Sequence, residues 1–211
     1  CSSDLSNVET LIGSSGDDDV TLAATVSGAN IDLGTGANTL TLAAGANTLA
    51  ASGVATITGS ANSDALTLTN AQNGTTIALG GGTDTLTLAD GGNSVTVSGG
   101  ETIIGGSVAD SVTLDSAGAV TISGIETLIG SSGDDAVTLA TAVNGASIDL
   151  GAGANTLTLA SGANTLAASG VATITGSSGS DTLTLTNAQS GTTIALGGGT
   201  DTLTLAAGGN T

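Results

Sequence analysis

The fold is decided by a short unit that one stretch shows clearly, Gly34-Thr35-Gly36-Ala37-Asn38-Thr39-Leu40-Thr41-Leu42. Its first half is a glycine-rich turn, since glycine permits the positive φ of tight corners and Asn tolerates or caps them. Its second half alternates apolar and hydroxyl residues with a period of two, which is typical of a short strand with one buried face. We expect Leu to point inward and Thr, whose β-branch suits a pleated surface, to point outward.

The unit recurs along the whole chain. The central apolar residues of successive strand-like runs lie 8 to 11 residues apart, with a mean spacing of nine: Val20, Ile31, Leu40, Leu49, Ile57, Leu66, Ile77, Leu86, Val95, Ile103, Val112, Val120, Leu128 and Val137. Short strands joined by equivalent turns, with no helix between them, predict an all-β parallel β-solenoid, a β-roll or β-helix. The spacing alone is compatible with two or with three strands per coil.

A longer repeat contains the shorter one. Residues 11–18 return as residues 128–135, an offset of 117 residues, and residues 5–94 align with residues 122–211 at about four-fifths identity. The sequence therefore predicts a boundary segment (residues 1–4), a first long repeat (5–121) and a second, incomplete one (122–211) in one continuous solenoid. Each long repeat holds thirteen strands, so successive repeats are expected to be rotated relative to the coil. Neither end carries an obvious polar cap, which predicts a longer array or end-to-end joining.

Cys1 is the only cysteine, so a disulfide framework is excluded. Two interpretations of it compete: the lipid-modified first residue of a lipoprotein, or a fragment boundary. The second is favoured, because the repeat pattern begins at Leu5, already in mid-repeat.

Composition limits the possible functions. The chain has no Lys, Arg, His, Pro, Met or aromatic residue, a formal charge of −18, and 39% hydrophobic residues. The apolar content argues against disorder and predicts a thin, layered core of small and branched aliphatic side chains. Nucleic acid and anionic lipid are excluded as partners because both need Lys and Arg, and no apolar run approaches the roughly 18 residues of a membrane helix. Each carboxylate must be solvated, hydrogen-bonded by backbone N–H groups, or neutralised by a metal ion.

Several turns resemble the nonapeptide of bacterial repeats-in-toxin proteins, Gly-Gly-x-Gly-x-Asp-x-apolar-x. Residues 13–21 match it apart from Ser14, residues 79–87 match apart from Leu79, residues 59–67 match more loosely, and residues 33–41 carry Asn38 in the Asp position. Residues 5–211 also resemble the degenerate β-strand repeats of giant secreted bacterial adhesins and surface-layer proteins. The resemblance implies a right-handed β-roll with two strands per coil, calcium ions between turns, and an extracellular or cell-surface location in bacteria.

Calcium is the predicted cofactor. Seven aspartates hold the motif position and are the candidate metal ligands: Asp18, Asp64, Asp84, Asp110, Asp135, Asp181 and Asp201. Stacked carboxylates repel one another, and calcium takes six to eight oxygen ligands. In a two-strand coil Asp64 would stack on Asp84 and Asp181 on Asp201, giving the best sites. Asp18 on Asn38 and Asp135 on Asn155 would give weaker ones.

An alternative needs no metal. Six asparagines could form hydrogen-bonded ladders instead: Asn38, Asn47, Asn93, Asn155, Asn164 and Asn210. Five other acids alternate outward from apolar neighbours and are expected on a solvated face, where they discourage lateral aggregation: Glu9, Asp32, Glu101, Glu126 and Asp149.

The expected function is structural. The chain has no aromatic platform for a sugar, no His, Lys or Tyr as base or nucleophile, and a long repeat that argues against a unique site, so neither an enzyme nor a small-molecule substrate is expected. We predict a repeat segment of a secreted filament, biofilm-matrix fibre, surface layer or adhesin stalk whose partners are copies of itself. The alternative is an ice-binding solenoid that uses Thr-x-Thr pairs: Thr39/Thr41, Thr56/Thr58, Thr67/Thr69, Thr85/Thr87 and Thr156/Thr158.

Overall fold

The computed structural model describes residues 2–5 and 7–211, with side chains from Asn7 onward. Over this part of the chain the regular elements are all β-strands, and no helix is long and apolar enough to cross a membrane. The question of lipid on Cys1 falls outside the described residues. Two compact units are present, Cys1–Val108 and Ala109–Thr211. They divide the chain by contacts, whereas the predicted long repeats divide it by sequence similarity.

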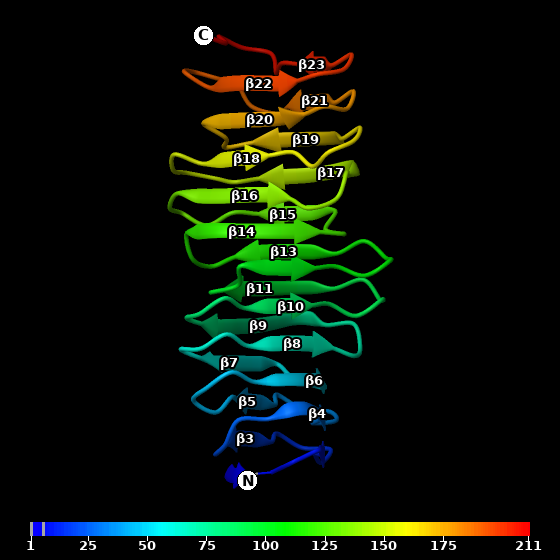
Figure 1. Cartoon of the computed structure of the whole chain (residues 1–211), viewed down its shortest axis with the longest axis vertical. Coiled ribbons are helices and arrows are strands. Elements are labelled where there is room, and N and C mark those ends of the chain that lie inside the picture. Colours follow the sequence, from blue (N-terminus) through cyan, green and yellow to red (C-terminus); the bar gives the residue numbers. More distant parts are fainter. Residues whose placement is uncertain (1, 6) are drawn as a thin grey trace. The chain divides into compact units, whose positions relative to one another are not determined.

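The first unit contains twelve described strands. They are β1 (Ser2–Leu5), β2 (Thr10–Ile12), β3 (Asp19–Leu22), β4 (Ser27–Asp32), β5 (Thr39–Thr41), β6 (Thr48–Ser52), β7 (Thr56–Ser60), β8 (Ala65–Leu68), β9 (Asn73–Gly80), β10 (Thr85–Thr87), β11 (Ser94–Ser98) and β12 (Thr102–Ile104). The odd-numbered strands form one sheet, in the order β1-β3-β5-β7-β9-β11, and the even-numbered strands form the other (Figure 1). The strand β1 includes residues 2–4, which the sequence assigned to a boundary segment.

The second unit repeats this arrangement with eleven strands. They are β13 (Ser111–Leu114), β14 (Gly118–Ser123), β15 (Thr127–Ile129), β16 (Asp135–Leu139), β17 (Asn144–Asp149), β18 (Thr156–Thr158), β19 (Thr165–Ser169), β20 (Thr173–Ser177), β21 (Thr182–Leu185), β22 (Thr193–Gly197) and β23 (Thr202–Thr204). Odd-numbered strands again pair with odd-numbered strands, and even-numbered with even-numbered.

Strand pairing resolves the number of strands per coil. Within each unit a strand pairs in parallel with the strand two positions later; Val20 lies opposite Leu40, and Leu40 lies opposite Ile57. One coil therefore has two strands and takes 20 or 17 residues in these two steps. The predicted parallel β-solenoid is confirmed, and the two-strand alternative is the correct one.

The core is the predicted layer of aliphatic side chains. The fourteen central apolar residues from Val20 to Val137 lie in fourteen consecutive strands, β3 to β16, and none is more than 6% exposed. Their neighbours in the strands face outward, as the alternating burial along β11 shows. The nine-residue spacing thus predicts both the strands and their buried faces.

The 117-residue repeat is also visible in the strands. The strand β5 corresponds to β18 and β8 corresponds to β21, each pair with matching bounds at this offset. Thirteen strands separate corresponding elements. A sequence that forms an odd-numbered strand in the first unit therefore forms an even-numbered strand in the second.

Candidate site: the polar turn ladders

Two kinds of turn carry the candidate residues. The serine turns (residues 13–18, 59–64, 130–135 and 176–181) read Gly-Ser-x-x-x-Asp. The leucine turns (residues 33–38, 79–84, 150–155 and 196–201) begin with Leu-Gly and end in Asn or Asp. The closing polar residue of each turn lies at or next to the start of the following strand.

The four predicted stacked pairs each join a serine turn to a leucine turn. In every pair the backbone N–H of the serine-turn Asp donates to Oδ1 of the leucine-turn residue. The N···O distances are 2.8 Å for Asp18–Asn38, 2.7 Å for Asp64–Asp84, 2.8 Å for Asp135–Asn155 and 2.9 Å for Asp181–Asp201. The stacking expected from a two-strand coil is therefore confirmed. A hydrogen bond from a backbone N–H to a side-chain oxygen joins the two residues of each pair.

The serine-turn carboxylates have donors of their own. Asp64 Oδ2 accepts the N–H of Ser60 at 2.9 Å, and its Oδ1 accepts both the backbone N–H and the Nδ2 of Asn47 at 2.8 Å. Equivalent bonds run from the Ser four residues earlier to Asp18, Asp135 and Asp181. Because a buried N–H left unpaired costs about 1–3 kcal/mol, these carboxylates stabilise the turn by accepting from it.

The hydrogen bonds of Asp181 favour its ionised form. Burial opposes ionisation, but donors from Asn164 and Ser177 outweigh it and hold the pKa of Asp181 below the ordinary value of 3.8. Since the pKa is lower in the folded state than in the unfolded state, the resulting stability is present above about pH 4. It is lost as the pH falls through the folded-state pKa.

The asparagine ladders are confirmed. The Oδ1 of each predicted asparagine accepts a backbone N–H from a residue 20 or 21 positions earlier, at 2.8–3.3 Å. The donor–acceptor pairs are Asp18–Asn38, Val26–Asn47, Gln72–Asn93, Asp135–Asn155, Val143–Asn164 and Gln189–Asn210. Asparagines and aspartates share these ladders, so the expected alternatives are parts of one structure.

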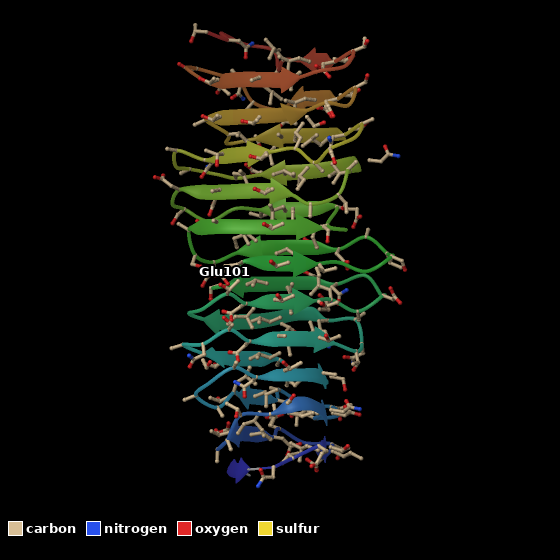
Figure 2. All side chains as sticks on the ribbon, viewed as in Figure 1. Glu101 is labelled. Atoms are coloured by element: carbon tan, nitrogen blue, oxygen red, sulfur yellow. The ribbon has the colours of Figure 1, made fainter. Side chains whose placement is uncertain are left out.

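Two glutamates correct the sequence prediction. Glu101 and Glu126 are partly buried, and their Oε2 atoms accept the backbone N–H of Asp84 at 2.6 Å and of Asp110 at 2.8 Å. Glu101 lies at the turn edge of its coil (Figure 2). The expectation of a solvated face is wrong for both, whereas Asp32 and Asp149 are exposed as expected. The missed signal is position: Glu101 directly precedes a strand, as the ladder aspartates do.

This arrangement is suited to accepting backbone N–H groups. Over the described residues no group of three or more His, Cys, Asp or Glu side chains gathers where it could hold a metal ion. Both carboxylate oxygens of Asp64 accept backbone N–H groups, whereas Oδ2 of Asp84 has no hydrogen-bond partner. Calcium at the seven aspartates remains a prediction of the resemblance.

Each unit has a notch beside a short turn. A notch of about 350 Å³ lies where the short turn at Gly53–Ala55 is flanked by longer turns, and a notch of about 380 Å³ lies at the equivalent place in the second unit. Glycine, small side chains, Asn, Gln and Thr line both, without a carboxylate. Comparison with models of known families, with curated proteins and with solved structures found no match.

Proposed function

We propose that this chain is a non-catalytic structural segment of a secreted bacterial filament, matrix fibre, surface layer or adhesin stalk, and that copies of it associate end to end. The repeated coil supports this proposal. Each coil offers the next one the same two strand edges, the same aliphatic layer and the same polar ladders, so length can grow without a new core.

A comparison of two equivalent coils shows what a following coil covers. Leu203 lies in β23, the last strand of the second unit, and Leu205 follows it; they are 40% and 46% exposed. Their counterparts at the 117-residue offset, Leu86 and Leu88, are covered by a following coil and are 0% and 3% exposed. A further coil, from the same chain or from a second copy, would bury the two leucines and pair the open edge of β23.

We expect the purified chain to form filaments in electron micrographs, with an axial spacing of about 4.8 Å between strands. The double substitution Leu203→Asp with Leu205→Asp should shift the population to short rods, because a charge cannot be buried at the joint without a partner. The matched control is Thr202→Asp with Thr204→Asp, which adds the same two charges to the outward side of the same strand. Short rods for the wild type, or equal filaments for both variants, would contradict end-to-end association.

The same experiment tests calcium. Filaments that form in calcium and disappear after chelation would place calcium at the joint between copies. Filaments that persist after chelation would remove calcium from the proposal.

A second candidate is ice binding, and the strand register favours it in one place. On the odd-numbered sheet of the first unit, Thr39, Thr56, Thr76 and Thr96 lie opposite one another in successive strands. Beside them Thr21, Thr41 and Thr58 form a parallel row that continues as Ala78 and Ser98. The other predicted Thr pairs lie in even-numbered strands, and Thr69 lies just beyond β8.

Thermal hysteresis in dilute solution decides this candidate. An ice-binding face should lose its hysteresis on Thr56→Tyr, which breaks the longer row, and keep it on Thr67→Tyr in the other sheet. A wild-type chain without hysteresis would retire the idea.

A further inference from the structure

Asp84 closes a leucine turn, a position that two of the other leucine turns fill with an amide donor, Asn38 and Asn155, and the fourth fills with Asp201. Asn38 Nδ2 donates to the carbonyl of Leu33 at 3.1 Å and to the carbonyl of Gly53, in the following coil, at 2.6 Å. Asn155 Nδ2 donates in the same way to Leu150 at 3.0 Å and to Gly170 at 2.7 Å. The side chain that closes a leucine turn therefore accepts with one atom and donates with the other.

The backbone around Asp84 has the same form. Asp84 lies 46 residues after Asn38, and the strands that follow, β5 and β10, have equivalent bounds. The glycine of the following coil has φ of 65° in both places, at Gly53 and at Gly99. The counterparts of the two accepting carbonyls are thus those of Leu79 and Gly99. A carboxylate here presents an oxygen where the asparagines present an N–H.

The structure shows the mismatch directly. Asp84 is 0% exposed, its Oδ1 accepts the N–H of Asp64, and its Oδ2 is buried with no hydrogen-bond partner. Over the described residues this Oδ2 is the one buried side-chain polar atom in that condition. Since a buried charged oxygen without a donor is strongly unfavourable, the ionised form does not suit this position.

The neighbouring charges act in the same direction. Asp64 faces Asp84 from the preceding coil, and Glu101 faces it from the following coil. The chain has no Lys, Arg or His to offset them. Burial first, and then repulsion from Glu101 and Asp64, raises the pKa of Asp84 above 3.8, although the hydrogen bond from Asp64 opposes this.

We propose that Asp84 is a neutral carboxylic acid in the folded protein and that its proton replaces the amide donor of the asparagine found in the equivalent turns. The single O–H of protonated Oδ2 can then donate to one of the Leu79 and Gly99 carbonyls, while Oδ1 keeps its bond from the N–H of Asp64. One leucine turn of the first unit thereby becomes sensitive to pH, and its equivalents at Asn38 and Asn155 do not.

The direction of the pH effect follows from the raised pKa. The folded state holds this proton more tightly than the unfolded state, so its contribution to stability is complete below about pH 4. The contribution is lost as the pH rises through the folded-state pKa. The coil containing Asp84 is therefore joined most firmly to its neighbours in acid.

The test compares two substitutions that remove the same charge one coil apart. Asp84→Asn supplies the missing amide donor and should raise Tm at pH 7 by about 3 °C or more, an advantage that shrinks toward pH 4. Asp64→Asn places an N–H against the Ser60 N–H and should lower Tm at pH 7. If simple relief of repulsion were the cause, both substitutions would raise Tm, and that result would overturn the proposal.

Two further measurements test the protonation of Asp84 directly. The reverse substitution Asn38→Asp should lower Tm at pH 7 and recover near pH 4, which would reproduce the Asp84 behaviour in another turn. A carbon-13 NMR titration, assigned with Asp84→Asn, should show one carboxyl that stays protonated well above pH 3.8. An Asp84 carboxyl that titrates at or below pH 3.8 would overturn the proposal. So would a calcium effect at this residue, in which millimolar calcium raises the Tm of the wild type but not the Tm of Asp84→Asn.

Discussion

Replacement of Gly80 by alanine should lower the free energy of unfolding by about 3 kcal/mol or more. Gly80 has φ of 102°, which an L side chain adopts only with strain, at a cost on the order of 1–3 kcal/mol. A Cβ added there would also overlap the carbonyl oxygen of Ser60 in the preceding coil, and forcing coils apart adds about 1–3 kcal/mol. Both costs fall on the junction of β9 with its turn.

Three other glycines separate the two costs. Gly59→Ala meets the Leu79 carbonyl without a positive φ, Gly74→Ala has φ of 82° in open space, and Gly209→Ala has neither problem. Denaturant unfolding should rank Gly80 as the most sensitive of the four, Gly59 and Gly74 between, and Gly209 as neutral. A neutral Gly80→Ala would mean that the coils are not in contact at this turn.

The sequence predicts the fold well because one physical pattern repeats. A buried aliphatic residue about every nine positions can be satisfied by short stacked strands, so Val20, Ile31, Leu40 and their successors identify the strands and their inward faces. The stacking of Asp64 on Asp84 also follows, since it needs only the order of the turns and two strands per coil.

The chemistry of the turns could not be predicted in the same way. Whether an Asp points toward solvent or toward the N–H of a Ser four residues earlier depends on the path of the turn, which the motif Gly-x-Gly-x-Asp does not specify. The serine turns and the leucine turns both match that motif loosely. Both carboxylate oxygens of Asp64 nevertheless accept hydrogen bonds, whereas Oδ2 of Asp84 has no donor. Glu101 was missed because its outward alternation suggested solvent, while its place before β12 puts it at the turn edge.

Replacement of Asn38 by leucine should destabilise the fold nearly as much as the Gly80 substitution, although asparagine and leucine side chains are similar in size. Asn38 is 0% exposed, accepts the N–H of Asp18 at 2.8 Å, and donates to Leu33 and Gly53 at 3.1 and 2.6 Å. Leucine would leave one N–H and two carbonyls of three successive coils without this partner. At about 1–3 kcal/mol for each buried group left unpaired, we expect a loss of about 3 kcal/mol or more in the free energy of unfolding.

The control is Asn62→Leu, because Asn62 is exposed in the neighbouring kind of turn and its side chain makes none of these bonds. Its expected effect is within about 0.5 kcal/mol. If Asn38→Leu behaved like this control, the aliphatic layer alone would hold the coils together, and the ladders would serve only to choose the register. A large loss of unfolding free energy for Asn38→Leu alone would show that the hydrogen bonds of the buried amide stabilise the stacking of the coils. A chain without cations or aromatic residues would then owe its cohesion to two repeating elements, the aliphatic layer inside and the polar ladder along each edge.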